Sequence, residues 1–495
     1  MKKIEINSLP DLKKGSNRKD NSNYIYQDVN PSDFLLAESS GKKYYFRTYG
    51  CQANIRDEEL LAGMLDACYM SKTEDLEEAD LIIILTCCVR ENAENKVFGE
   101  IGNLKALKQK NKNLIIAVGG CMVEQPHIVE KISTTYNQVD IVFGTHNINE
   151  FLALLEQKYR SNNRVIDVKS MSGDVIEVNV SSHRQDKHKA FVNIMYGCNK
   201  FCTYCIVPYV RGKERSRKKE DIIKEVNELI NLGYKEITLL GQNVNSYGKD
   251  LYKDYNFANL LEDVAKTNIE RLRFTTSHPW DFSKEMVDVI AKYDNIMKYI
   301  HLPVQSGNDY ILKKMNRQYT RESYLELVNY IKEKIPNVVF STDIIIGFPN
   351  ETYEQFLDTK SLCEIVEYDN VYSFIYSPRE GTPAARMVDE VSYEEKSKRF
   401  IELQKTNEQI IAKKADLMVG KTYKVLVDSV SKRNEEFLTG YNENNKVINF
   451  KGDKSLIGSI VKVKITESHT YSLIGELVND WRNEKTDFRN KIRFI

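Results

Sequence analysis

The chain has 495 residues, 41% of them hydrophobic, and its 71 Lys and Arg are balanced by 71 Asp and Glu. Such a length allows roughly two to four domains with substantial cores. The balanced charge excludes a global positive field, so affinity for a polyanion would have to come from local patches. No run approaches the roughly 18 apolar residues of a membrane helix, and the N-terminus lacks the apolar core of a signal peptide, so we expect a cytoplasmic protein without membrane contact.

The first part of the chain predicts a leader and one α/β domain. Residues 1–40 are polar, without sustained apolar periodicity, and are expected to be a flexible leader with no fold of their own. Residues 42–159 alternate short apolar runs such as LIIILTC with helical stretches, which predicts a Rossmann-like domain with a parallel sheet. Residues 160–189 turn polar and irregular, as an interdomain linker does.

The rest of the chain predicts a second α/β domain and a small β domain. Residues 190–417 contain six strand and helix units, beginning with FVNIMYG and KEITLLGQ, which favour a partial (β/α)6 barrel. Residues 418–482 carry short alternating strands punctuated by Gly and Asn, the pattern of a small β-barrel. Residues 483–495 form a tail, and the fold class is multidomain α/β.

A loop of three thiols follows the first strand of the predicted barrel. The segment YGCNKFCTYC places Cys198, Cys202 and Cys205 where the loops of a β/α barrel assemble reactive sites. Structural zinc sites and simple electron-transfer clusters normally use four protein ligands, so three thiols leave one iron of a [4Fe-4S] cluster open. We expect S-adenosylmethionine (SAM) to bind that iron. The alternative is half of a zinc site whose fourth ligand lies elsewhere.

A second set of thiols is more widely spaced. Cys51, Cys87 and Cys121 each close a predicted strand of the first domain, in YYFRTYGC, LIIILTC and NLIIAVGGC. The carboxyl ends of parallel strands lie along one edge of a sheet, so these cysteines are expected to meet and hold a second cluster with one open iron. The alternative is three unrelated buried thiols.

The other cysteines have different expected roles. Cys68 and Cys363 lie on apolar helical faces and are expected in the core. Cys88 adjoins Cys87, and since neighbours in an extended chain point opposite ways, only one of them should face the cluster; we choose Cys87.

Polar residues at the strand ends of the barrel are candidates for binding SAM, because a nucleoside with a methionine tail needs such groups. The alternative for each is a turn or packing role. The candidates are Tyr204, Gln242, Asn243, Gln305, Ser306 and Asp343. No histidine shows a paired metal spacing, so no separate acid or base residue is assigned.

Basic residues cluster in RGKERSRKK, in ALKQKNKN and in the C-terminal strands as KVINFKGDK and VKVK. Each run could contact RNA or form a solvated face.

The motifs TYGCQAN, TCCVRENAENK, GGCMVEQ and YGCNKFCTYCIVPYVRG together resemble those of the radical-SAM methylthiotransferases. The resemblance covers about residues 42–480, in the order N-terminal cluster domain, radical-SAM barrel and TRAM domain. Within the family the motifs are closest to those of the tRNA enzymes that make 2-methylthio-N6-isopentenyladenosine. Three positions depart from the usual pattern: Leu85 stands for Asn, Cys88 for Ser and Ala53 for Met.

The resemblance implies two [4Fe-4S] clusters, with the one at Cys51, Cys87 and Cys121 carrying or donating sulfur. Two SAM molecules per turnover would supply the methyl group and a 5′-deoxyadenosyl radical. The substrate would be C2 of N6-isopentenyladenosine at position 37 of a tRNA, with the TRAM lysines contacting phosphates. A low-potential electron donor such as flavodoxin or ferredoxin would be needed, and we expect a monomer.

Two alternatives remain at this point. The same chemistry could act on N6-threonylcarbamoyladenosine in tRNA or on an aspartate of a ribosomal protein. A different class would be a non-catalytic RNA-binding protein stabilised by zinc, which would be colourless and would not cleave SAM.

Overall fold

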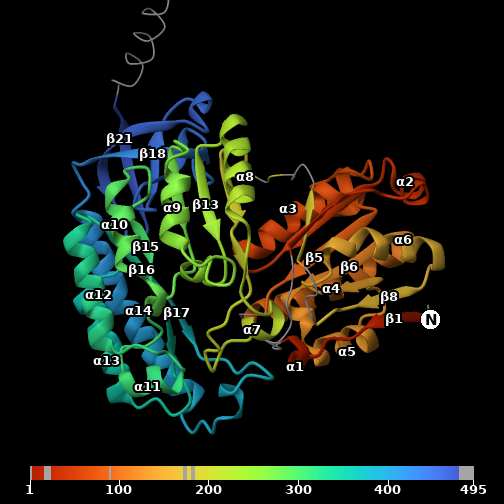
Figure 1. Cartoon of the computed structure of the whole chain (residues 1–495), viewed down its shortest axis with the longest axis horizontal. Coiled ribbons are helices and arrows are strands. Elements are labelled where there is room, and N and C mark those ends of the chain that lie inside the picture. The colour runs from red at the N-terminus through yellow and green to blue at the C-terminus, as the bar shows by residue number, and fades with distance from the viewer. Residues whose placement is uncertain are drawn as a thin grey trace, which may run out of the picture.

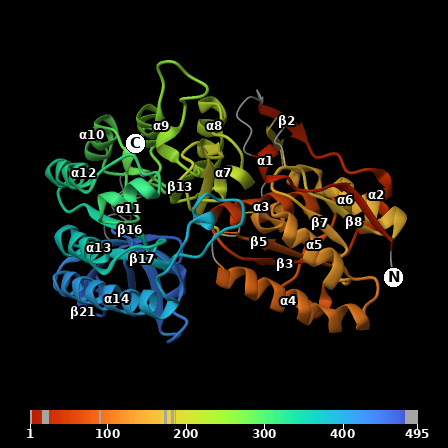
Figure 2. The ribbon, with the colours of Figure 1, turned by 90° about the horizontal axis from the view of Figure 1, so that it is seen from below.

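The computed structural model describes residues 3–15, 24–88, 91–170, 175–179, 184 and 186–478. An N-terminal α/β domain lies beside an open β/α barrel, and a small β-barrel sits against one end of the latter (Figure 1). The same arrangement is seen from below in Figure 2. No helix in the described ranges has the length and apolar character needed to cross a membrane.

The N-terminal domain is built on a parallel seven-stranded sheet in the order β1-β8-β7-β6-β5-β3-β4. Its strands are β1 (Ile4–Ser8), β3 (Lys43–Thr48), β4 (Ser71–Lys72), β5 (Leu81–Thr86), β6 (Ile115–Gly120), β7 (Ile141–Phe143) and β8 (Arg164–Asp167). Every residue of β5 and β6 is buried, as expected for central strands of a parallel sheet covered on both faces.

Helices cover both faces of this sheet and give it two apolar cores. One core joins the sheet to α2 (Asp33–Ser39), α3 (Gln52–Asp66) and α6 (Phe151–Ser161). The other joins it to α4 (Glu91–Lys110) and α5 (Pro126–Thr135). The predicted α/β domain is therefore present, with its strands where the apolar runs lie.

The expectation that residues 1–40 have no fold is wrong for the part that the structure describes. Strand β1 pairs in parallel with β8 at the sheet edge, and β2 (Tyr24–Asp28) pairs with β9 (Val175–Asn179). The short helix α1 (Leu12–Gly15) follows β1. Backbone hydrogen bonds to a distant strand hold this polar segment, and a local apolar period cannot reveal such pairing. Strands β8 and β9 also place part of the predicted linker in sheets; residues 16–23 lie outside the described residues.

The barrel domain contains two three-stranded parallel sheets, β10-β13-β14 and β15-β16-β17. A parallel bridge between Leu272 and Ile296 joins them into one curved wall. The strands are β10 (Lys189–Asn193), β13 (Glu236–Leu240), β14 (Arg271–Phe274), β15 (Tyr299–His301), β16 (Val339–Ile346) and β17 (Asn370–Ile375), and a short hairpin is formed by β11 (Met195–Tyr196) and β12 (Arg215–Ser216).

Helices cover the outside of this wall. They are α8 (Lys219–Asn231), α9 (Phe257–Ala265), α10 (Lys284–Lys292), α11 (Asp309–Lys314), α12 (Arg321–Lys334), α13 (Tyr353–Val366) and α14 (Tyr393–Asp416). The short helix α7 (Val207–Val210) lies instead between the barrel and the N-terminal domain (Figure 1). Cys363 is fully buried within α13, and Cys68 is fully buried just after α3, so both lie in the core as predicted.

The C-terminal strands close into a five-stranded barrel in the order β18-β19-β20-β22-β21. They are β18 (Thr422–Val430), β19 (Phe437–Asn442), β20 (Val447–Lys451), β21 (Ile460–Ser468) and β22 (Ser472–Leu477). This barrel docks on the amino ends of the larger barrel's strands, where the Arg271 guanidinium donates to the carbonyl oxygens of Tyr441 at 2.8 Å and Asn442 at 2.6 Å. The small barrel therefore covers the end of the β/α barrel opposite the cysteine loop.

Candidate functional site

Three cysteines of the N-terminal domain follow strands at one edge of the sheet, as predicted. Cys51 is the N-cap of α3, Cys87 directly follows β5, and Cys121 begins the 3-10 turn Cys121–Glu124 after β6. The Cys87 thiol donates a hydrogen bond to Cys51, which is exposed, and this bond together with Arg211 lowers the pKa of Cys51 to about 6. Gly50 permits this approach, since a Cβ there would lie 2.3 Å from the Cys87 Cβ.

Cys88 lies in the same site, which differs from the expectation that only Cys87 would face it. Cys88 is buried and donates to Cys121, and this hydrogen bond raises the pKa of Cys88 while it lowers that of Cys121. Strict alternation fails because β5 ends at Thr86 and the chain bends at Cys88. Four thiols rather than three therefore gather at this edge.

The second thiol set lies in the loop between β11 and α7. Cys202 is buried and Cys198 and Cys205 are partly buried. Burial raises the pKa of Cys198 and raises that of Cys205 to about 12, so these thiols would lose their protons only to a metal or another strong positive charge. Arg317 donates to the Cys202 Sγ at 3.4 Å.

The two thiol sets face each other across the interface between the domains. Cys88 and Cys121 share one apolar cluster with Ile206, which directly follows Cys205, and with Val210 at the end of α7. Thr145 of the N-terminal domain donates to the Val210 carbonyl oxygen at 2.8 Å. The edge of the parallel sheet and the mouth of the barrel thus meet at the cysteines.

Among the residues the structure describes, no three His, Cys, Asp or Glu side chains are close enough to hold a single metal ion. In a four-iron cluster each thiolate binds a different iron, so its ligands do not need to converge on one point. The donor type fits such clusters: each site offers three or more thiols, at least one of them buried, and a cation lies beside one sulfur, Arg211 for Cys121 and Arg317 for Cys202.

The residues predicted to bind SAM make different kinds of contact in the structure. Gln242 accepts from the Gly197 N–H at 2.6 Å and so supports the cysteine loop. Tyr204 is packed into the apolar cluster around Met315 and Phe348. Ser306 is fully buried and bonds Thr359 of α13, which is a packing role.

Of the other three candidates, Gln305 and Asn243 are buried and Asp343 is partly buried. Gln305 has a positive φ of 70° and bridges to Ile344, while Asp343 lines a cavity. Asn243 is 1% exposed, and its Oδ1 has no hydrogen-bond partner within the described structure.

Buried polar atoms without partners mark a further part of the barrel mouth. Ser277 and His278 follow β14, and the Ser277 Oγ and both ring nitrogens of His278 lack partners among the described residues, as does the Asn243 Oδ1. Buried groups of this kind are normally satisfied by a ligand or by water. Burial and Arg317 lower the pKa of His278 to about 2, so the ring stays neutral. In the sequence, the segment TTSHP at a strand end points to Ser277 and His278, but a single histidine is not enough to predict a binding site.

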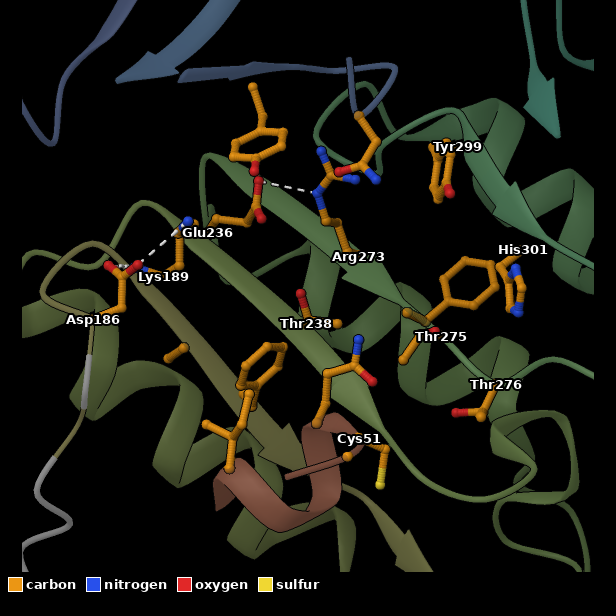
Figure 3. A pocket seen from close by; sticks show the side chains of 18 of the residues that line it. Cys51, Asp186, Lys189, Glu236, Thr238, Arg273, Thr275, Thr276, Tyr299 and His301 are labelled. Carbon is orange, nitrogen blue, oxygen red and sulfur yellow. Dashed lines mark hydrogen bonds and ion pairs between the residues drawn. The ribbon is translucent and has the colours of Figure 1, made fainter. Parts of the chain in front are cut away.

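A cavity of about 730 Å³ extends from the N-terminal domain through the barrel to the small β-barrel (Figure 3). Gly50, Cys51 and Cys87 line one end, and Tyr441 of β19 lines the other. Between them lie inward-facing side chains of the barrel strands. These are Phe191, Glu236, Thr238, Arg273, Tyr299, His301, Asp343 and Tyr372.

The basic run RGKERSRKK is not an exposed patch. Arg211, Arg215 and Arg217 are each at most 7% exposed. Arg217 donates to Glu225 of α8 at 2.7 Å. An RNA contact through these three arginines is therefore excluded.

Family comparisons agree with this architecture. The chain matches the uncharacterized protein family UPF0004 over residues 43–144, the radical SAM superfamily over residues 192–363 and the TRAM domain over residues 416–478. It is 52% identical to the tRNA-2-methylthio-N(6)-dimethylallyladenosine synthase of Geobacillus kaustophilus, over 95% of this chain and 89% of that protein. The chain belongs to the radical-SAM methylthiotransferases.

Further relatives carry the same name. The protein from Bacillus subtilis is 51% identical over 95% of this chain and 92% of its own length, and that from Staphylococcus haemolyticus is 52% identical over 94% of this chain and 91% of its own. The predicted family and the predicted α/β multidomain fold with a C-terminal TRAM barrel are confirmed.

A solved structure shows the same fold at low sequence identity. The radical S-adenosylmethionine methyltransferase TsrM from Kitasatospora setae, with cobalamin and a [4Fe-4S] cluster bound, aligns with a TM-score of 0.50 and 12% identity. The alignment covers 70% of this chain and 77% of that one. At this identity the likeness shows the fold alone.

Proposed function

We propose that this radical-SAM enzyme inserts sulfur and a methyl group at C2 of N6-isopentenyladenosine 37 in tRNA. The observation that carries the proposal is the meeting of two thiol sets at one interface, with Cys88, Cys121, Ile206 and Val210 in a single cluster. Relatives named for this reaction match the chain along nearly its whole length. The three relatives named above all carry the name of this reaction.

The donor sets fit two [4Fe-4S] clusters. Cys51, Cys87 and Cys121 would hold the auxiliary cluster, and Cys198, Cys202 and Cys205 the one that binds SAM. When bound, the clusters and two SAM molecules supply the electron, the 5′-deoxyadenosyl radical, the sulfur and the methyl group. No acid or base on the chain could readily activate an aromatic C–H bond, so a radical route is needed.

The chain's own residues hold and orient these groups. The unpartnered atoms of Asn243, Ser277 and His278 at the barrel mouth suit the polar parts of SAM, and the neutral His278 ring can both donate and accept. Gln242 fixes the cysteine loop through Gly197. Tyr204, Gln305, Ser306 and Asp343 complete the proposed surroundings, Tyr204 and Ser306 by packing.

The large cavity would take the adenosine and its isopentenyl group. Cys51 and Cys87 line one end of it, so a base held there lies beside the auxiliary site. Phe191, Tyr299 and Tyr372 offer aromatic faces against which a splayed base can stack.

The TRAM barrel offers a basic outer face for the tRNA backbone. Lys424 of β18 and Lys462 of β21 pair across strands, and Lys464 follows on the same face; all three are exposed. Lysines on one face contact phosphates without reading sequence. A low-potential donor of the flavodoxin or ferredoxin type, a monomeric state and a cytoplasmic location complete the proposal.

The test is an anaerobic incubation of reconstituted protein with SAM, a reductant and isopentenylated tRNA. Mass spectrometry then quantifies the methylthio nucleoside and 5′-deoxyadenosine. Cys198→Ala should abolish SAM cleavage, whereas Cys87→Ala should keep some cleavage and lose sulfur insertion. Cys363→Ala, which removes a buried thiol in α13, is the matched control and should keep both products.

Each outcome separates the alternatives. SAM cleavage without a methylthio product on this tRNA would direct attention to threonylcarbamoyladenosine or a ribosomal protein. A colourless protein that binds zinc and leaves SAM intact would refute the enzymatic role.

A further inference from the structure

Arg211 belongs to the barrel domain, but its side chain lies in the cysteine site of the N-terminal domain. It is the C-cap of α7, and its N–H donates to the Val207 carbonyl oxygen at 2.8 Å. Gly212 follows with a φ of 72°, so the chain turns away immediately. The residue is 7% exposed.

The guanidinium makes three contacts in the N-terminal domain. Its Nε donates to the Cys121 Sγ at 3.1 Å. Its Nη2 donates to the Asp57 Oδ2 at 2.8 Å and to the Asn54 Oδ1 at 3.1 Å. A single side chain from the barrel thus holds one thiol and the first turns of α3.

Asn54 extends this contact to the other cysteine loops. Its Nδ2 donates to the Tyr49 carbonyl oxygen at 2.7 Å and to the Thr86 carbonyl oxygen at 3.0 Å. Tyr49 lies two residues before Cys51, and Thr86 directly precedes Cys87. Arg211 is therefore connected to all three cysteine loops, directly or through one amide.

We propose that Arg211 is a positioning residue that sets the reduction potential of the auxiliary cluster and couples its three loops to the barrel. The inference rests on the proposed function, because it requires a cluster at Cys51, Cys87 and Cys121. Reduction adds negative charge to a cluster, and a buried cation that donates to a ligating sulfur stabilises the reduced state. The loop that carries Arg211 begins at the other cysteine set, so any shift of that loop reaches the auxiliary site.

The neighbouring carboxylate of Asp57 lets the proposal predict the direction in which two variants shift the reduction potential. Asp57 is 7% exposed and partly offsets the Arg211 charge at the cluster. Arg211→Gln leaves that carboxylate without its cation and should favour the oxidised cluster. Asp57→Asn leaves the cation without its carboxylate and should favour the reduced cluster. Loosened packing alone would not shift the reduction potentials of the two variants in opposite directions.

The test uses full-length protein in which Cys198, Cys202 and Cys205 are all replaced by Ala, so that only the auxiliary cluster is observed. Anaerobic redox titration is followed by electron paramagnetic resonance. With Arg211→Gln the ratio of reduced to oxidised cluster at a fixed potential should fall about tenfold, a shift of about 59 mV for one electron. Asp57→Asn should shift the ratio the other way, and Arg211→Lys should retain most of the parent value.

One control variant and three contrary results complete the redox test. Lys213→Gln removes one charge from the same loop and should leave the potential unchanged. Equal shifts in the same direction for Arg211→Gln and Asp57→Asn, or no shift in either, would overturn the role of Arg211. If the parent protein with three Ala substitutions binds no cluster, the proposed ligation fails instead.

Coupling is tested in the enzyme with all its cysteines. Arg211→Gln should keep SAM cleavage while the methylthio product falls at least tenfold, and Arg211→Lys should restore part of the product. A parallel loss of cleavage and product would contradict an effect confined to the auxiliary site.

Discussion

Replacing Glu225 by Gln should strongly weaken the contact between the N-terminal domain and the barrel. Glu225 lies on α8 and accepts from Arg217 at 2.7 Å, Arg184 at 2.5 Å and Arg56 at 3.4 Å. Arg56 belongs to α3, so the carboxylate joins the two domains. Burial alone would raise the pKa of Glu225, but these arginines hold it at about 2.

The magnitude follows from that pKa. Against an ordinary value of 4.5, and at about 1.36 kcal/mol for each pKa unit, the charged form is stabilised by roughly 3 kcal/mol. Glu225→Gln also removes the carboxylate that three guanidinium groups share. Arg56 and Arg184 keep Glu59, so the loss stays at the lower end of the roughly 3–5 kcal/mol that breaking a buried pair costs. We expect the variant to lose about 3 kcal/mol of unfolding free energy at pH 7.

Urea unfolding measured at pH 7 and at pH 3 checks the prediction. The folded pKa is lower than the unfolded one, so the stabilisation is complete above about pH 4.5 and is lost as the pH falls toward 2. The difference between wild type and variant should therefore shrink at pH 3. Glu228→Gln, an exposed change on the same helix, is the control; a Glu225→Gln protein as stable as this control at pH 7 would refute the reasoning.

Two further substitutions test the site. Burial raises the pKa of Glu124 to about 8; since the unfolded side chain ionises near 4.5, its burial lowers stability by up to about 1.4 kcal/mol per pH unit between 4.5 and 8. Glu124→Gln should therefore gain stability over wild type as the pH rises, whereas exposed Glu130→Gln should not, as thermal unfolding at pH 5 and 8 would show. Gly197→Ala should abolish iron incorporation at the cysteine loop. Gly197 has a φ of 72°, and a Cβ there would lie 2.0 Å from a backbone carbonyl oxygen. Normal iron content in the purified variant would contradict this prediction.

The apolar periods and the cysteine positions were enough to predict the central strands and the placement of the thiols. Strands β5 and β6 are buried throughout, so their sequences are continuous apolar runs, and a thiol directly after each run has to lie at the carboxyl edge of the sheet. These features are local, and local features are what a sequence shows directly.

Features that depend on distant partners could not be predicted in this way. Strand β1 has the sequence IEINS, which is mostly polar because it lies at the edge of the sheet and pairs with residues about 160 positions later. The run RGKERSRKK has the composition of a basic surface, yet Arg211 and Arg217 are buried because Asp57 and Glu225 pair with them. Cys88 joins the thiols because the chain bends after β5.

The pairing of β1 with β8 also fixes an order of assembly. The first strand cannot take its place until residues 164–167 have been synthesised, which at about 5–20 residues per second is roughly 8 to 32 s after Ile4 is made. Once β8 is made it can pair with β7, but its other edge has no partner until β1 docks, so the sheet is completed by the oldest residues of the chain. Leu12 then packs beside Cys88 and Cys121, so the last strand to dock also brings the covering of the thiols.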